Sequence, residues 1–117
     1  MKLINWRDGR TIAEQVETAH NLTARLFGLM GRSDLPKGFA FIIPGCRQVH
    51  TFFMRFPIDV VYTDAQDKVV CVVEHIKPFR VTGYCRDAEC AIELPAGTIS
   101  DNEIIMGDVL AFEDMAE

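Results

Sequence analysis

Apolar residues fall in short runs separated by turn residues along most of this chain, a pattern typical of β-strands. Residues 3–7 and 10–13 form two such runs, and the Asp8-Gly9 pair between them is a strong signal for a hairpin. Later runs are divided by prolines, by glycines and by a polar turn at residues 64–67. The strands expected after the hairpin cover residues 39–43, 49–54, 58–63, 68–74, 80–84, 89–94 and 108–112.

One segment has the periodicity of a helix instead. Asn21 is a suitable N-cap, Gly31 is a natural stop, and most apolar side chains between them recur every three or four residues. We therefore expect one short helix near residues 21–30. Residues 12–19 allow two interpretations, because their apolar positions fit one face of a helix as well as a strand.

The length and composition fit one globular domain. The chain has 117 residues, of which 49% are hydrophobic and 25% are charged, and no stretch has the composition of a linker. One helix is too little for alternating βαβ units. The sequence therefore predicts a mainly β fold over residues 1–117: a single-domain sandwich or jelly-roll-like barrel of seven or eight short strands, with one short helix near residues 21–30.

Charge is unevenly distributed, although the net charge is only −5. Residues 1–60 carry eight Lys and Arg against five Asp and Glu, whereas residues 61–117 carry four against twelve. A pI of about 5.1 argues against binding of nucleic acid through its phosphates. No apolar run is long enough for a secretory signal or a membrane span, so we expect a cytoplasmic protein that binds neither nucleic acid nor membrane. A local basic patch is still formed by Arg25, Arg32, Arg47 and Arg55.

The cysteines and histidines lack the paired spacing of metal sites. No cysteine belongs to a Cys-x-x-Cys pair, so we expect free thiols, with Cys85 and Cys90 as the one pair near enough in sequence for a disulfide. The three histidines lie far apart in the sequence. We therefore expect no metal and no cofactor, while a constellation of Cys46, His50 and a distant carboxylate stays an alternative.

Residues 46–62 depart from the plain alternation of a half-exposed strand. His50 and Arg55 lie there among Phe, Met, Pro and Ile residues, and a buried His or Arg needs a partner. Asp59 follows Arg55 by four residues, across Pro57, and is the natural partner for it. The Arg55–Asp59 pair is either a structural ion pair that fixes the bend or part of a ligand site.

Three blocks of the sequence occur together in a known order. They are the Arg25-Leu-Phe-Gly-Leu-Met-Gly-Arg32 run, the segment from His50 to Asp59, and Glu93-Leu-Pro-Ala-Gly97 followed by Gly107-Asp108. In this order they resemble the bacterial and archaeal family catalogued as domain of unknown function 192, over about residues 20–110. The resemblance implies a compact, mainly β fold of the sandwich or jelly-roll type. It supplies no established activity, substrate or cofactor.

Glu93 lies between two apolar residues of an expected strand and points away from them. It is therefore either solvated or paired with an arginine of the basic half, with Arg25 or Arg32 as the partner. Arg–Glu pairing across the sheet would account for the opposite charges of the two halves of the chain.

These observations place a candidate functional surface on residues 46–62 and the Arg25–Arg32 block. The leading hypothesis is a non-catalytic binding domain for a small anionic molecule or a protein partner, because arginines suit carboxylates. A hydrolase or transferase that uses His50 with a carboxylate or Cys46 is the alternative, and a structural or assembly component is a further one. The candidate ligand-binding residues are Arg25, Arg32, His50, Arg55, Asp59 and Glu93.

Overall fold

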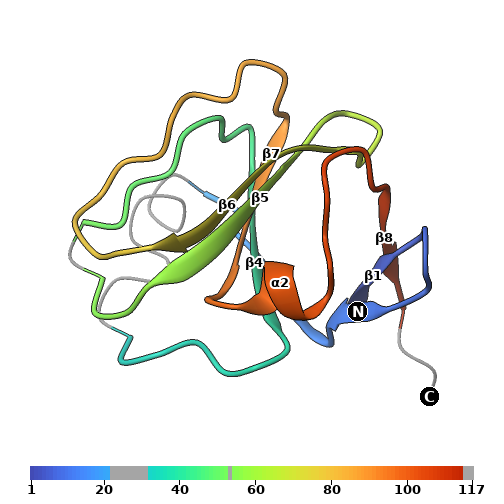
Figure 1. The fold of residues 1–117 in the computed structure, drawn as a ribbon, viewed down its shortest axis with the longest axis horizontal. Coiled ribbons are helices and arrows are strands. Elements are labelled where there is room, and N and C mark those ends of the chain that lie inside the picture. Colours follow the sequence, from blue (N-terminus) through green and yellow to red (C-terminus); the bar gives the residue numbers. More distant parts are fainter. Residues whose placement is uncertain (22–31, 53, 115–117) are drawn as a thin grey trace.

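A five-stranded sheet with the order β3-β4-β7-β5-β6 forms the centre of the molecule (Figure 1). Neighbouring strands are antiparallel except β3 and β4, which are parallel. The computed structural model describes residues 1–21, 32–52 and 54–114. The strands of this sheet are β3 (Gln15–Thr18), β4 (Phe39–Pro44), β5 (Ile58–Thr63), β6 (Val69–Ile76) and β7 (Cys90–Pro95).

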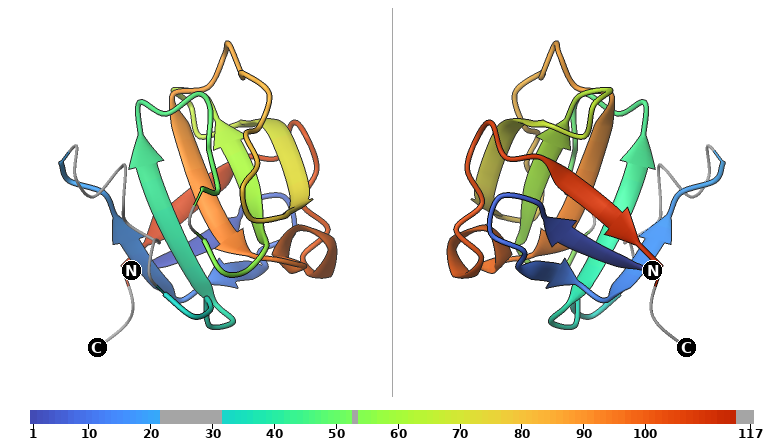
Figure 2. Two further views of the ribbon diagram at one scale, coloured as in Figure 1. Left: turned by 90° about the vertical axis from the view of Figure 1, so that its left-hand side faces the viewer. Right: turned by 90° about the vertical axis from the view of Figure 1, so that its right-hand side faces the viewer.

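A second, three-stranded antiparallel sheet with the order β2-β1-β8 packs against one face of the first sheet (Figure 2). Its strands are β1 (Lys2–Asn5), β2 (Thr11–Ala13) and β8 (Leu110–Glu113). The short helix α2 (Thr98–Asp101) covers the same face through Ile99. The apolar core between these elements includes Leu3, Ile12, Ile42, Val61, Ile92, Leu94 and Leu110.

Two irregular segments, which we name the cover segments, lie over the other face of the five-stranded sheet. They are the described residues of 45–57 and 77–89, at the left of Figure 1, and backbone hydrogen bonds such as Thr82 N–H to the Val49 carbonyl (2.9 Å) join them. Their apolar side chains complete a second core on this face. Because both faces of the sheet are covered, every residue of β5 is buried. The cover segments contribute Val49, Met54, Phe56, Cys85 and Ala88 to this core.

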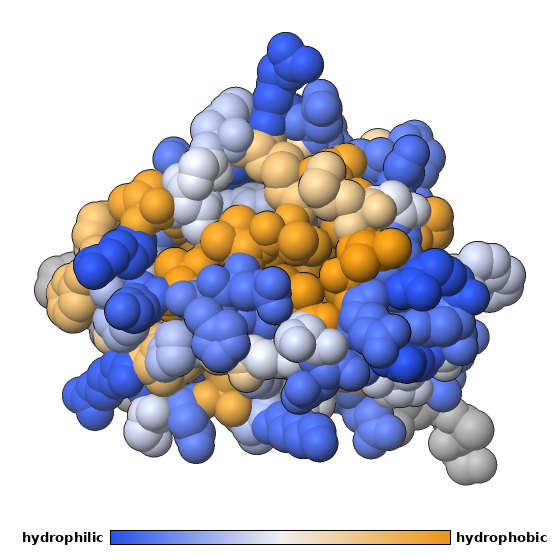
Figure 3. Space-filling model, viewed as in Figure 1, coloured by the Kyte–Doolittle hydropathy of each residue, from blue (hydrophilic) through white to orange (hydrophobic). Residues whose placement is uncertain are grey.

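The strand β6 forms one edge of the five-stranded sheet. Apolar side chains gather in the middle of the face that Figure 3 presents, over this strand. Val72 of β6 is half-buried, and Ile105 and Met106 on the loop before β8 are exposed. No helix among the described residues is long and apolar enough to cross a membrane.

The mainly β prediction is confirmed: the described residues form eight strands in two packed sheets, without a closed barrel. The helix expected near residues 21–30 falls largely outside the described residues. The helix at Thr98–Asp101 was not predicted, because four residues are too few to produce a periodic pattern. It follows Gly97, whose φ of 96° reverses the chain after β7.

Two expected strands are absent from the structure. Residues 49–54 and 80–84 contain only an isolated bridge between His50 and Val81. Backbone pairing between them is limited to bonds such as Thr51 N–H to the Arg80 carbonyl (2.8 Å). The Thr51 hydroxyl oxygen donates to the Lys77 carbonyl (2.6 Å) and accepts from the Arg80 N–H (2.9 Å), so a side chain serves Arg80 where a ladder would supply a carbonyl.

The helical interpretation of residues 12–19 is also wrong. Thr11–Ala13 pairs with β1, and Gln15–Thr18 forms the edge strand β3 beside β4. The apolar spacing that fits a helix face arises because the chain passes from one sheet to the other at Glu14, so its buried side chains belong to two different layers.

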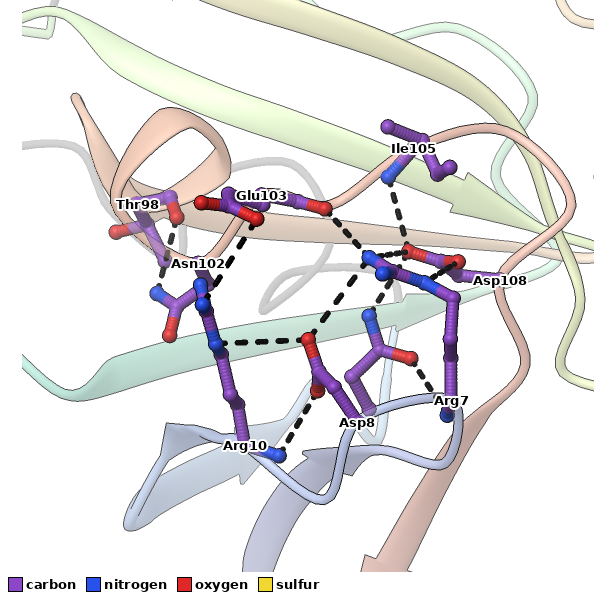
Figure 4. Close-up of polar contacts among 9 residues, drawn as sticks. Arg7, Asp8, Arg10, Thr98, Asn102, Glu103, Ile105 and Asp108 are labelled. Atoms are coloured by element: carbon purple, nitrogen blue, oxygen red, sulfur yellow. Dashed lines mark hydrogen bonds and ion pairs between the residues drawn. The ribbon is translucent and has the colours of Figure 1, made fainter.

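A polar network fastens the N-terminal hairpin to the loop that precedes β8 (Figure 4). The buried carboxylate of Asp108 accepts hydrogen bonds from Arg7 Nε (2.7 Å), Asn5 Nδ2 (2.8 Å) and the Ile105 N–H (3.0 Å). Arg7 also donates to the carbonyl oxygen of Glu103 (2.8 Å). Burial opposes ionisation of Asp108, but the hydrogen bonds outweigh it and hold the pKa of this carboxyl below its usual value.

Substituting Asp108→Asn should therefore remove a pH-dependent part of the stability. Because the pKa of Asp108 is depressed in the folded state, its contribution is complete above about pH 4 and is lost as the pH falls further. At pH 7 we expect the variant to lose about 1–2 kcal/mol of unfolding free energy. In urea unfolding, the difference in unfolding free energy between wild type and variant should be smaller at pH 3 than at pH 7. The exposed Asp87→Asn is the control, and an equal difference at both pH values would contradict the assignment.

Candidate functional site

The register of the five-stranded sheet places four side chains in one row across it. Glu17 of β3 lies opposite Phe41 of β4, Phe41 lies opposite Glu93 of β7, and Glu93 lies opposite Val60 of β5. Residues directly opposite one another in a sheet project from the same face. Phe41 and Val60 belong to the core under the cover segments, so Glu93 points into that core.

Glu93 is the chemically unusual residue of this face. Its side chain lies in an apolar core, the residue is only 5% exposed, and its Oε2 atom has no hydrogen-bond partner among the described residues. Burial raises the pKa of Glu93 to about 8, so the carboxyl group is largely protonated at neutral pH. The expectation that Glu93 is solvated is wrong.

Apolar side chains from the second sequence block share this core with Glu93. Met54 and Phe56 are buried there together with the β4 residues Phe39 and Phe41. We name this buried group of side chains the Glu93 face. Its members are Phe39, Phe41, Met54, Phe56, Val60 and Glu93.

Arg32 marks the edge of the Glu93 face. Its guanidinium group forms an ion pair with Glu17 (3.2 Å) and lies 5.0 Å from the centre of the Phe39 ring. Glu17 and Glu93 are two strand spacings apart, about 10 Å between their backbones. Arg32 thus pairs with Glu17, while the expected partnership between Arg25 and Glu93 stays a prediction, since Arg25 lies outside the described residues.

Asp59 has a different role from the one that the sequence suggested. It is fully buried and accepts hydrogen bonds from the backbone N–H groups of His75 (2.9 Å), Gly97 (3.1 Å) and Ile99 (2.9 Å). The expected ion pair between Arg55 and Asp59 is wrong: the described residues contain no such contact, and Arg55 is exposed. Sequence reasoning missed these partners because Gly97 is 38 residues away from Asp59.

His50 lies in a cover segment, away from any carboxylate contact in the described structure. Its ring stacks on that of Phe52 with 5.4 Å between the centres, and its Nδ1 atom accepts a hydrogen bond from the Phe52 N–H (3.3 Å). The thiol of Cys46 donates to the Gln48 carbonyl (3.1 Å). Both groups thus contact backbone atoms two residues farther along the chain.

A pocket of about 390 Å³ opens at one end of the cover segments. Arg47 lines it and is held by a hydrogen bond from Nε to the Ala88 carbonyl (2.9 Å), with its Nη1 atom 3.4 Å from the Tyr84 hydroxyl. The sequence analysis includes Arg47 in the basic patch but not among the candidate ligand-binding residues. Its contacts with Tyr84 and Ala88 span 37 and 41 residues, so the local sequence does not predict them. The lining residues are Gly45, Cys46, Arg47, Gln48, Tyr84 and Glu89.

The four cysteines are not joined by disulfides in this structure. The sulfur of Cys85 lies 3.0 Å from that of Cys71, so the structure brings Cys85 to Cys71 rather than to Cys90. In the part of the chain that the structure describes, no group of three or more His, Cys, Asp and Glu side chains is arranged to hold a metal ion.

Comparison with known sequences finds relatives along nearly the whole chain. The family model described as Uncharacterized ACR, domain of unknown function 192, matches residues 3–112, a longer stretch than the blocks suggested. A UPF0127 protein of Pyrococcus furiosus is 31% identical over 97% of this chain and 99% of its own length. A UPF0127 protein of Pyrococcus abyssi is 33% identical over 80% of this chain and 82% of its own length.

Two solved structures have a similar fold. A proposed transcription regulator from Sinorhizobium meliloti 1021 has a TM-score of 0.80 at 23% identity and covers 94% of this chain and 89% of its own. A protein of unknown function from Novosphingobium aromaticivorans DSM 12444 has a TM-score of 0.81 at 15% identity, with coverages of 95% and 82%. At these identities the similarity establishes the fold alone.

The buried carboxyl of Glu93 should make the protein less stable as the pH rises. Because the pKa of Glu93 is raised in the folded state, the stability that this one group contributes is fully present below about pH 4, the pKa of an unfolded Glu, and is lost as the pH rises to about 8. The slope of the unfolding free energy should reach roughly 1.4 kcal/mol per pH unit. Glu93→Gln keeps the shape and removes the titration, so its urea unfolding should vary less between pH 5 and pH 8.

The matched control for this measurement is Glu89→Gln, because Glu89 is an exposed glutamate just before β7. Its unfolding should follow the wild-type dependence on pH. Equal slopes for wild type and Glu93→Gln would show that Glu93 is ionised in the folded protein.

Proposed function

This chain belongs to the uncharacterised family of domain of unknown function 192, and we propose that it is a non-catalytic binding domain for a small organic acid with an apolar body. The single observation that carries the proposal is the buried carboxyl of Glu93 in the apolar core, whose Oε2 atom has no hydrogen-bond partner among the described residues. A buried polar group without a hydrogen bond costs about 1–3 kcal/mol. Such groups are rare in native proteins and commonly have a functional explanation.

The protonated form of Glu93 suits an anionic ligand. A neutral carboxyl group donates a hydrogen bond to a carboxylate oxygen, whereas an ionised one would repel it. The apolar side chains of the Glu93 face supply the contacts for the rest of such a ligand. Arg32, above Phe39, and the exposed Arg55, three residues before β5, supply positive charge near the same end of the sheet.

Access to Glu93 requires movement of the cover segments. Glu93 is covered in this structure, and in the described residues the two cover segments are joined by an isolated bridge and by hydrogen bonds such as Thr51 N–H to the Arg80 carbonyl (2.8 Å), without a continuous ladder. Segments with few ladder bonds open locally at a lower free energy than a sheet does. A ligand would therefore enter by displacing part of this cover, with the sheet beneath left intact.

The geometry favours binding over catalysis. Glu93 accepts no hydrogen bond from a His or Cys side chain among the described residues, so no nucleophile–base pair includes it. Cys46 and His50 contact the backbone of their own segment.

The test is a thermal-shift screen of small organic acids, together with amides and amines of the same carbon skeletons. We expect acids to raise the Tm at pH 7 and the amines to leave it unchanged. If only protonated Glu93 binds, the Kd of a hit should rise roughly tenfold between pH 7 and pH 9, because the pKa of Glu93 lies at about 8. Arg32→Gln should weaken binding about tenfold, as expected for a charge-assisted hydrogen bond.

Two substitutions of Glu93 separate its roles. Glu93→Gln retains a donor group, so it should bind the acid within a few-fold of wild type and lose the dependence on pH. Glu93→Leu removes the donor and should weaken binding at least tenfold, whereas the exposed Glu89→Gln should bind like wild type. Tight binding by Glu93→Leu, preferential binding of amines, or no hit among the acids would overturn the proposal.

A further inference from the structure

Two cysteine side chains meet where the edge strand β6 lies against the second cover segment. Cys71 Sγ and Cys85 Sγ are 3.0 Å apart, and the two residues are separated by 14 positions in the sequence. A disulfide bond is about 2.05 Å long, so the two sulfurs need to approach by only about 1 Å. Cys71 is partly exposed on β6, whereas Cys85 is buried at 6% exposure in the core.

The backbone on both sides holds this pair in place. Cys71 lies opposite Tyr62 in the ladder between β5 and β6. The Cys85 N–H donates to the Arg47 carbonyl (2.8 Å), and the Ala88 N–H donates to the Cys85 carbonyl (3.2 Å). The approach of the two sulfurs is thus a product of the fold, and bond formation needs little rearrangement of the chain.

We propose that Cys71 and Cys85 are a site of reversible disulfide formation that fastens the second cover segment to the edge of the sheet. The oxidant is a low-molecular-weight disulfide of the glutathione class. This proposal does not depend on the proposed ligand.

The exposures of the two thiols give the order of the steps. The accessible Cys71, as its thiolate, attacks one sulfur of the small disulfide, so a mixed disulfide forms and one small thiolate leaves. Burial raises the pKa of the Cys85 thiol, so Cys85 is the poorer first nucleophile and acts second. It loses its proton and attacks Cys71 Sγ, which releases the second small thiol. Overall, the two protein thiols are oxidised to one disulfide and the small disulfide is reduced to two thiols.

The second cover segment is the part of the molecule that the bond would restrain. It is held to the sheet by the contact between the Tyr62 hydroxyl and Thr82 Oγ1 (2.6 Å) and by the Cys71–Cys85 contact. A disulfide that closes a ring of this size shifts the unfolding equilibrium toward the folded state by roughly 100-fold. Oxidation should therefore stabilise the protein, and reduction should reverse the effect.

The experiment treats the full chain with oxidised glutathione and counts free thiols after denaturation. The count should fall from the four of the reduced protein to two, and the intact mass should fall by two hydrogens. Peptide mapping should find the peptides of Cys71 and Cys85 linked. The urea midpoint should rise on oxidation and return to its starting value after treatment with dithiothreitol.

Variants make the result specific to this pair. Cys71→Ser and Cys85→Ser should each abolish the fall in mass, and Cys90→Ser, which changes a half-buried thiol outside the pair, should retain it. If Cys85→Ser fails to fold because Cys85 is buried, Cys71→Ser alone decides the outcome. An unchanged thiol count, a persistent mixed disulfide with glutathione in the wild type, or a link between another pair of cysteines would overturn the proposal.

Discussion

The carboxylate of Asp59 connects three separate parts of the fold. It lies near the start of the buried strand β5 and accepts hydrogen bonds from backbone N–H groups at the end of β6, at the turn after β7 and at the start of α2. A carboxylate that is fully removed from water needs several donors, and here the donors all come from the main chain. This arrangement fixes how β7 lies beside β5, since Ile58 pairs with Pro95 directly before the turn. The position of Glu93 opposite Val60 follows from the same register.

Asp59 of β5 and Glu93 of β7 are both buried acidic residues, but their surroundings differ. Asp59 points to the side of the small sheet and is surrounded by N–H donors, whereas Glu93 points to the side of the cover segments and has apolar neighbours. Neighbouring side chains on a strand alternate between its faces, so one sheet can carry both without conflict. Burial of the same chemical group therefore yields an ionised group bonded to the main chain in one layer and a largely protonated group among apolar side chains in the other.

Much of the fold could be predicted because its central strands are buried on both faces and are bounded by turn residues. The Asp8-Gly9 hairpin and the strands β4 to β8 lie close to the expected positions. The sequence predicts strands at residues 49–54 and 80–84 because both are short runs bounded by turn residues. In the described structure these two stretches are joined by one isolated bridge and by hydrogen bonds that include the Thr51 hydroxyl. The candidate site was only partly predictable. The alternation of side chains along a strand predicts the face from which Glu93 projects. The N–H partners of Asp59 and the contact of Cys71 with Cys85 join residues far apart in the sequence, so local patterns do not predict them.

The pairing of the first strand with the last has a consequence for synthesis on the ribosome. Lys2 lies opposite Glu113, and Leu3, which is fully buried, lies opposite Phe112 (Figure 1). The ladder between β1 and β8 therefore forms only after β8 has been made, whereas β1 and β2 pair residues that are close in the sequence. Contacts between such distant parts of a chain also form slowly. The small sheet is thus expected to be completed late in folding, when β8 joins the hairpin of β1 and β2 beside the larger sheet.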